Sequence, residues 1–172
     1  MEPPSHSERF DEFFRRLWSP TVRHCARLVG DVGDAEDAAA EAFARAYLDW
    51  KRLAQLSHRD AWLMRVASNI SIDRVRSRTR QYTLMRRVAP RDDVPDGSDA
   101  IALALGMATA LRSLSKRQRE VVCLRHLWGL SEREVAETLG LSTNSVKTHA
   151  ARALARLRDR VPGDVLEDNL AI

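Results

Sequence analysis

Hydrophobic residues return every three or four positions along most of this chain, which is the repeat of an amphipathic α-helix. The stripe is clearest near the N-terminus, where it consists of Phe10, Phe13, Phe14, Leu17, Trp18, Val22, Ala26 and Val29. Nowhere do β-branched residues alternate with polar residues over the length of a strand. The pattern therefore predicts an all-α fold.

Turn and cap residues divide the first half of the chain into three predicted helices. Pro20 is expected to break the first helix, and Gly30 and Gly33 are expected to end it. Asp34 is the expected N-cap of the second helix, because its carboxylate can accept a hydrogen bond from a free backbone N–H. The second helix places four apolar residues on one face, namely Ala39, Phe43, Ala46 and Trp50. A third helix with a basic face is predicted over residues 60–78.

Residues 83–97 interrupt the helical pattern. They contain Pro90, Pro95 and a cluster of aspartates, which favour neither a helix nor a hydrophobic core. We therefore predict a flexible linker here, between one domain over residues 8–82 and a second domain over residues 98–161. The expected fold is two small helical domains joined by this linker.

The second domain carries the pattern of a helix-turn-helix. Two capping boxes open its middle helices, and they pair Ser115 with Gln118 and Ser131 with Glu134. Gly140 then supplies the left-handed residue that a tight helix stop requires, and Ser142 caps a last helix expected over residues 143–160. A helix, a short turn containing glycine and a second helix together predict a helix-turn-helix.

The last predicted helix has one apolar and one polar face. A turn of about 100° per residue gathers on one side the apolar residues Val146, Ala150, Ala153, Leu154 and Leu157. Asn144, Thr148 and Arg152 lie opposite, with no carboxylate before Asp159. Arginine, asparagine and small hydroxyl side chains recognise base edges in a major groove. We favour DNA recognition over the alternative, which is a polar helix face that meets only solvent.

Composition narrows the possible function classes. Lysine and arginine exceed aspartate and glutamate by 28 to 24, so the net charge of +4 is modest and its location decides the partner. Cys25 and Cys123 are expected to be buried free thiols. The chain lacks GxSxG, HExxH and P-loop motifs, so we expect no enzyme activity, no metal and no cofactor. No signal peptide and no apolar stretch of ~20 residues is present, which predicts a cytoplasmic protein without membrane insertion.

Three segments resemble the extracytoplasmic-function (ECF) sigma factors of bacterial RNA polymerase. They are GDAEDAAAEAFARAY and AWLMRVASNISIDRVRSRTR before the linker, and LSKRQREVVCLRHLWGLSEREVAETLGLSTNSVKTHAARALARLR after it. The segments occur in the same order as in the family, and the resemblance covers most of residues 9–160. It implies a sigma factor that binds core RNA polymerase, directs promoter-specific initiation and associates with the nucleoid when in holoenzyme.

The resemblance also implies roles for individual residues. Docking on the coiled-coil clamp of the largest polymerase subunit would involve Asp34, Glu36, Asp37, Glu41 and Phe43. Residues 51–59 and the next helix would bind the minus-ten element and its melted strand. The residues of that helix implied in binding are Trp62, Asn69, Asp73, Arg74 and Arg76. The duplex minus-thirty-five element would be read by Asn144, Ser145, Lys147, Thr148, His149 and Arg152. An anti-sigma factor is a further implied partner.

Two positions depart from the family pattern, and two other function classes fit parts of the sequence. Family members commonly have Gly where Asn144 stands and Arg where His149 stands, which leaves the base preference open. The helix-turn-helix alone would also suit a transcriptional regulator that does not replace the sigma subunit. A third alternative is a helical adaptor that contacts only protein. The basic helix after Ala61 favours the sigma factor, because it offers cations to single-stranded DNA. Trp62 in that helix fits a core residue better than a stacking platform.

Overall fold

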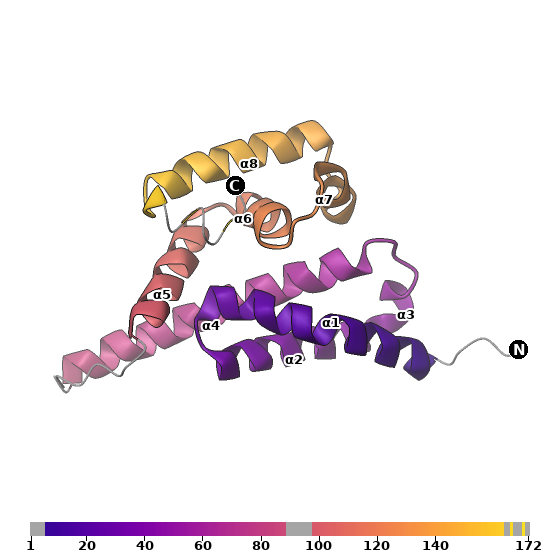
Figure 1. Cartoon of the computed structure of the whole chain (residues 1–172), viewed down its shortest axis with the longest axis horizontal. Coiled ribbons are helices and arrows are strands. Elements are labelled where there is room, and N and C mark those ends of the chain that lie inside the picture. The colour runs from indigo at the N-terminus through magenta and orange to yellow at the C-terminus, as the bar shows by residue number, and fades with distance from the viewer. Residues whose placement is uncertain (1–5, 89–97, 164–165, 167–169, 171–172) are drawn as a thin grey trace, which may run out of the picture.

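The structure, a computed structural model, describes residues 6–88, 98–163, 166 and 170, and every regular element in that part of the chain is a helix. The elements are α1 (His6–Val29), α2 (Val32–Leu48), α3 (Trp50–Leu53), α4 (Arg59–Val88), α5 (Ser98–Ser113), α6 (Lys116–Val122), the π-helix η1 (Cys123–Leu127), α7 (Glu132–Leu139) and α8 (Thr143–Arg158). Figure 1 shows α1, α2 and α4 in one layer and α6 to α8 in another, with α5 leading from the first to the second. The all-α prediction is confirmed.

The first helix does not break at Pro20, so that prediction was wrong. Proline lacks the N–H that would bond to the carbonyl of Arg16, but both residues lie outside the buried stripe. On the inner side Phe13 and Leu17 are buried, and the Thr21 hydroxyl donates to the Leu17 carbonyl at 2.7 Å. Packing against α2 and α4 therefore holds the helix together across the proline.

The second helix begins three residues earlier than the sequence predicted. Its N-cap is Asp31, whose side chain accepts from the backbone N–H of Asp34 at 2.8 Å. Asp34 is thus an acidic residue of the first turn, where it stabilises the positive end of the helix dipole. Gly33 lies inside α2, while Gly30 ends α1 with a φ of 70°. The prediction of Asp34 as the N-cap was wrong, because Asp31 and Asp34 lie three positions apart and an aspartate at either position can cap a helix.

An aromatic cluster joins α1 to α2 and α3. The Phe14 ring lies 4.8 Å from the Phe43 ring, and the Phe13 ring lies 4.9 Å from Trp50, measured between centroids. Small side chains on α2 let the helices approach closely, and those fully buried are Ala35, Ala38, Ala39, Ala42 and Ala46. This packing fixes the orientation of α2. The charged residues of α2 therefore lie on the side that faces away from the core.

Helix α4 is longer than the sequence predicted. We expected its end near residue 78, and it continues to Val88, six residues into the predicted linker. Residues 79–88 contain neither proline nor glycine, so nothing in the local sequence stops the helix. The remaining linker residues, 89–97, lie outside the described part of the chain. The division into domains over 8–82 and 98–161 stays a prediction.

The predicted caps of the C-terminal half are confirmed. Ser115 and Ser131 each form a complete capping box, and hydrogen bonds from Ser131 hold the pKa of Glu134 below its usual range. Gly140 ends α7 with φ 64° and ψ 42°, the left-handed conformation. The sequence did not predict the π-helix η1. These caps set the turn between α7 and α8.

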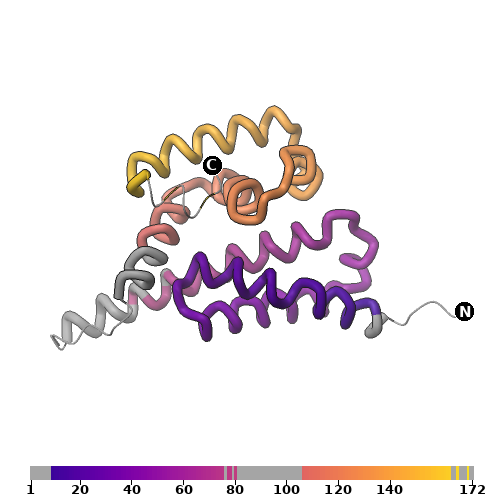
Figure 2. The backbone as a smooth tube through the Cα atoms, viewed as in Figure 1, coloured from indigo at the N-terminus to yellow at the C-terminus, as the bar shows by residue number. Residues whose placement is uncertain are grey.

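The two halves share a core. Helix α5 contacts both α1 and α4, and α4 also contacts η1 and α7. Figure 2 shows the backbone of the second half lying along that of the first. One cluster of buried side chains joins Leu28 of α1 and Ile72 of α4 to residues of the second half. That cluster also holds Leu166 and Leu170, which lie beyond the predicted end of the second domain and are fully buried. Leu166 and Leu170 therefore belong to the shared core.

Candidate nucleic-acid and polymerase interface

Helix α8 is positioned by the turn that precedes it. After Gly140, the side chain of Ser142 accepts from the backbone N–H of Ser145 at 3.1 Å and starts the helix. Val146, Ala153 and Leu157 are buried, as the sequence predicted. Figure 1 shows α8 at the outer edge of its layer, on the side away from α1 and α2. Its polar face is therefore open to solvent in this arrangement.

The predicted minus-thirty-five residues share that polar face. Asn144, Lys147, Thr148 and Arg152 are exposed, while Ser145 and His149 are half-buried. The Thr148 hydroxyl donates to the Asn144 carbonyl at 3.0 Å, and the Lys147 ammonium lies 3.7 Å from Glu132 Oε2. Arg152 forms no ion pair with any carboxylate that the structure describes. The face therefore presents a free guanidinium, an amide and a hydroxyl within two helical turns.

Two of the four acidic residues of α2 are exposed and two are half-buried. Glu36 and Asp37 are exposed, whereas Asp34 and Glu41 are half-buried against α4. Phe43 is 2% exposed and lies inside the aromatic cluster. The Phe43 ring therefore faces the core and offers almost no surface to a partner in this arrangement, and its implied polymerase contact stays a prediction. The sequence already indicated that Phe43 is buried, because Phe43 lies four residues after Ala39 on the predicted apolar face.

Arginines of α4 pair with these acidic residues. Arg74 Nη1 lies 3.1 Å from Asp37 Oδ2 and Arg74 Nη2 lies 3.3 Å from Glu41 Oε2, while Arg78 Nη1 lies 2.8 Å from Asp34 Oδ2. Partial burial lowers the pKa of Arg74, but its hydrogen bonds to Glu41 and Asp37 raise it more. The residues implied for polymerase docking and for minus-ten binding thus touch each other, which the sequence did not predict.

A polar groove of about 600 Å³ lies between α2 and α4 at these ion pairs. Asn69 and Asp73 line it together with Arg74, so three of the five implied minus-ten residues lie close together. Trp62 is half-buried and packs against the hydrophobic core, and the side chain of Arg76 lies outside the described part of the structure. This partial packing fits the core position that its spacing favoured, and its minus-ten role stays a prediction.

The two thiols are buried and inert. Burial raises the pKa of Cys25 and raises that of Cys123 to about 12, so neither is a thiolate near neutral pH. Cys25 and Cys123 are free, as the sequence predicted. Among the described residues, no three of His, Cys, Asp and Glu are grouped so as to hold a metal ion. No described helix has the length and apolar character needed to cross a bilayer.

Both halves of the chain match families of known proteins. Residues 13–81 match sigma-70 region 2, and residues 104–157 match sigma-70 region 4. The RNA polymerase sigma-E factor of Streptomyces coelicolor is 34% identical over 152 residues, which cover 88% of this chain and 85% of that protein. The ECF RNA polymerase sigma factor SigW of Bacillus subtilis is 32% identical, with 80% of each chain covered.

Solved structures agree with this at the level of the fold. The sigma factor RpoE of Bartonella quintana, solved with the anti-sigma factor NepR, superimposes with a TM-score of 0.55 at 22% identity, covering 91% of this chain and 98% of that one. CnrH, solved with the cytosolic domain of CnrY, gives a TM-score of 0.54 at 24% identity, covering 87% and 85%.

These matches decide between the function classes that the sequence left open. A regulator that does not replace sigma would need no region 2, and an adaptor that contacts only protein would need no region 4. Here both regions are present, in order, and the second carries the exposed polar face of α8. The chain therefore belongs to the ECF sigma factors, the transcription initiation factors that bind core RNA polymerase and direct it to promoter DNA.

Proposed function

We propose that three surfaces divide the work of this sigma factor. The outer face of α8 reads the minus-thirty-five element in the major groove. Helix α4 and residues 51–59 hold the melted minus-ten strand. The outer face of α2 docks on the coiled-coil clamp of the largest polymerase subunit. In holoenzyme the protein then lies on the nucleoid, and it catalyses no reaction of its own.

The exposed face of α8 carries this proposal. Arg152 and Asn144 are exposed, and the whole of α8 from Thr143 to Arg158 lacks a carboxylate. An unpaired guanidinium donates bidentately to guanine, and an amide pairs with adenine. Arg156 and Arg158 lie further along α8, where cations bind phosphates and fix the register of the helix.

Support for the docking surface comes from the mixture of side chains on α2. Exposed Glu36 and Asp37 lie on the same helix as three large exposed apolar residues, Val32 at 66%, Tyr47 at 52% and Leu48 at 86%. Acidic groups beside exposed apolar side chains are typical of a protein interaction surface. Of the five residues implied for docking, Phe43 is not part of this surface.

An anti-sigma factor is part of the proposal. Its support is the fold that this chain shares with RpoE, which was solved with the anti-sigma factor NepR. Initiation needs both the α2 surface and the α8 surface. Such a partner would therefore inhibit the sigma factor by covering only one of them.

In-vitro transcription tests the proposal. Purified bacterial core RNA polymerase would transcribe sheared genomic DNA with and without this protein, and the transcript starts would be mapped. We expect new starts that share two upstream elements. Substituting Arg152→Ala should relax the base preference at one position of the upstream element, at a cost of about 1–3 kcal/mol.

Arg156→Ala is the matched control on the same helix. As a phosphate contact, it should weaken initiation about equally at every promoter without changing the shared bases. An Arg152→Ala profile identical to that of the wild type would remove the base contact from the proposal. A protein that binds duplex DNA alone and produces no new starts would contradict the sigma mechanism.

A further inference from the structure

A second, smaller pocket lies at the end of the N-terminal half where α1, α3 and α4 meet. It has a volume of about 320 Å³ and is lined by three arginines, Arg9 and Arg16 from α1 and Arg59 from α4. Phe13, Trp50 and Glu12 complete most of its wall. Three guanidinium groups against Glu12 of the wall and Asp60, which pairs with Arg16, still leave an excess of positive charge at the pocket.

The aromatic wall does not offer a stacking surface. Phe13 is 4% exposed and Trp50 is 3% exposed, and their ring centroids are 4.9 Å apart in the core. The guanidinium carbon of Arg16 lies 5.9 Å from the centroid of Phe13. A nucleobase would find little aromatic face here, so the pocket suits a compact charged group better than a base.

The arginines differ in how firmly they are paired. Arg16 forms two hydrogen bonds with Asp60, at 2.5 and 2.9 Å, which neutralise it. Arg59 Nη1 reaches only the carbonyl oxygens of Ala54 and Leu56, at 3.4 and 3.5 Å. Neither Arg9 nor Arg59 forms an ion pair with a carboxylate of the described residues. Two guanidinium groups thus remain available for an anion with several acceptor oxygens.

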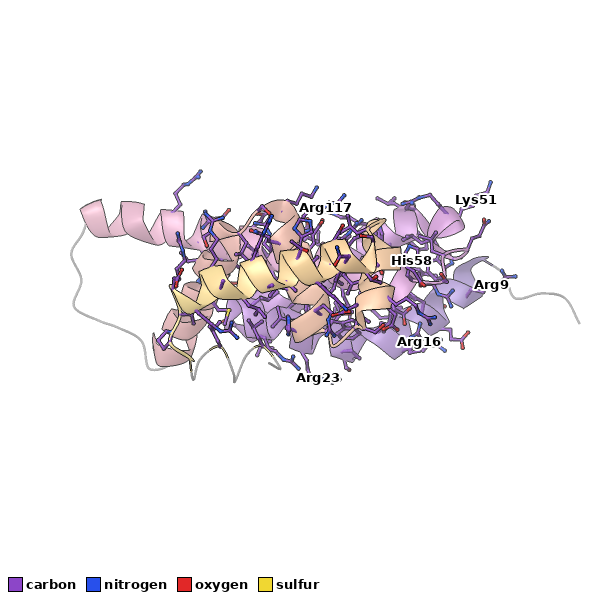
Figure 3. All side chains as sticks on the ribbon, turned by 90° about the horizontal axis from the view of Figure 1, so that it is seen from above. Arg9, Arg16, Arg23, Lys51, His58 and Arg117 are labelled. Atoms are coloured by element: carbon purple, nitrogen blue, oxygen red, sulfur yellow. The ribbon has the colours of Figure 1, made fainter. Side chains whose placement is uncertain are left out.

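The pocket adjoins the segment assigned above to the melted strand. Figure 3 shows Lys51, His58, Arg9 and Arg16 at the same end of the molecule. Arg59 itself ends residues 51–59 and begins α4. A strand that follows residues 51–59 would therefore carry its backbone past the pocket.

We propose that this pocket binds a backbone phosphate of the melted promoter strand through Arg9 and Arg59. Helix α1 then contributes directly to DNA binding, a role that none of the surfaces described above gives it. Arg16 is held by Asp60, so it forms part of the pocket wall and does not bind the phosphate. The inference rests on the proposed minus-ten function of residues 51–59.

The test measures binding of a single-stranded oligonucleotide to holoenzyme. Its sequence is the minus-ten element obtained from the mapped starts, and binding is followed by fluorescence anisotropy at several salt concentrations. Arg9→Gln and Arg59→Gln should each weaken binding by 3- to 10-fold. The double variant should also lower the slope of log affinity against log salt by about 0.7, the value expected for one lost phosphate contact on a single strand. Arg59→Lys should retain most of the affinity, because it keeps the charge.

Arg23→Gln is the matched control, since Arg23 is an exposed arginine of α1 that does not line the pocket. It should leave both affinity and salt slope unchanged. Oligonucleotides with a single neutral methylphosphonate linkage locate the contact. When the neutral linkage replaces the phosphate that the pocket binds, the wild type should lose affinity for the oligonucleotide. The double variant should lose none, because it no longer makes that contact.

Three outcomes separate the hypotheses. If wild-type holoenzyme binds the oligonucleotide and the pocket variants behave like Arg23→Gln, the pocket proposal is wrong and the minus-ten function stands. If wild-type holoenzyme does not bind it at all, the minus-ten function fails as well. If millimolar pyrophosphate binds the free protein through Arg9 and Arg59 while the variants bind DNA normally, the phosphate comes from a small molecule and the DNA assignment is overturned.

Discussion

His24 of α1 and Ser68 of α4 form a buried hydrogen bond, with 2.6 Å between Nε2 and the hydroxyl oxygen. The Ser68 hydroxyl donates to the Met64 carbonyl at 2.7 Å, so it accepts from the Nε2–H of a neutral imidazole. Nδ1 is buried and has no hydrogen-bond partner among the described residues. The His24 ring also lies 6.0 Å from the Trp128 ring between centroids, nearly perpendicular to it, and Arg27 donates to the Leu127 carbonyl. A neutral imidazole therefore lies where the two halves meet.

This geometry predicts a loss of stability in mild acid. Burial, and secondarily the charge of Arg27, lower the pKa of His24 from 6.5 to about 4. The unfolded chain binds the proton first, so the contribution of His24 is present above pH 6.5 and is lost as the pH falls towards 4. The free energy of unfolding should fall by about 2 kcal/mol between pH 7 and pH 5 from this residue. Urea unfolding followed by tryptophan fluorescence at each pH measures it.

A variant at this position separates His24 from other titrating groups. His24→Gln keeps an N–H donor for Ser68 and removes the proton uptake, so its stability should change less between pH 7 and pH 5. His58→Gln is the control, because His58 is a partly exposed histidine at the far end of the N-terminal half. Equal pH dependence in wild type and His24→Gln would show that other groups cause the loss.

Two glycines of the C-terminal half should respond in opposite directions to alanine. Neither Gly140 nor Gly106 has an atom within 4 Å of an added Cβ, so neither substitution causes a clash. Gly140 has a φ of 64°, and Gly140→Ala should destabilise the fold by about 1 kcal/mol. Gly106 lies inside α5, and Gly106→Ala should stabilise it by about 0.5–1 kcal/mol. Thermal unfolding compares the two, and the same sign of change in both would contradict the backbone argument.

The chain after α8 should contribute measurably to stability. Leu166 and Leu170 are 1% and 0% exposed within the core that both halves share. Leu170→Ala should therefore reduce the free energy of unfolding by about 2–5 kcal/mol, as expected for a buried leucine. Leu48→Ala on α2 is the control, since Leu48 is 86% exposed and should change stability by less than about 0.5 kcal/mol. If Leu170→Ala and Leu48→Ala changed the free energy of unfolding equally, Leu170 would not be part of the core.

The sequence predicted local structure better than long-range contacts. Capping boxes, the Gly140 stop and the buried face of α8 follow from spacing within one or two turns, and all were confirmed. The helix through Pro20 was missed because distant packing against α2 and α4 outweighs one lost hydrogen bond. The hydrogen bond between His24 and Ser68 was also missed. It joins residues 44 positions apart, and no periodicity relates such residues.

The ion pairs of Arg74 allow its part in folding to be separated from its part in initiation. Its side chain is 32% exposed and its partners Asp37 and Glu41 are 70% and 40% exposed, so solvent screens both pairs. Arg74→Ala should therefore change the free energy of unfolding by less than about 1 kcal/mol. Because Arg74 lines the groove with Asn69 and Asp73, the same variant should reduce binding of the minus-ten oligonucleotide by holoenzyme several-fold.

Arg45→Ala supplies the comparison for that variant. Arg45 also pairs with Glu41, at 2.6 Å, and also lines the groove, but it comes from α2 rather than from α4. If α4 carries the minus-ten contacts, Arg45→Ala should leave oligonucleotide binding nearly unchanged while costing a similar small amount of stability. Equal losses of binding in the two variants would mean that the charge of the groove matters rather than the position of Arg74. A loss of binding in Arg74→Ala that disappears when core polymerase is supplied in excess would instead place the defect in docking, through Asp37 and Glu41.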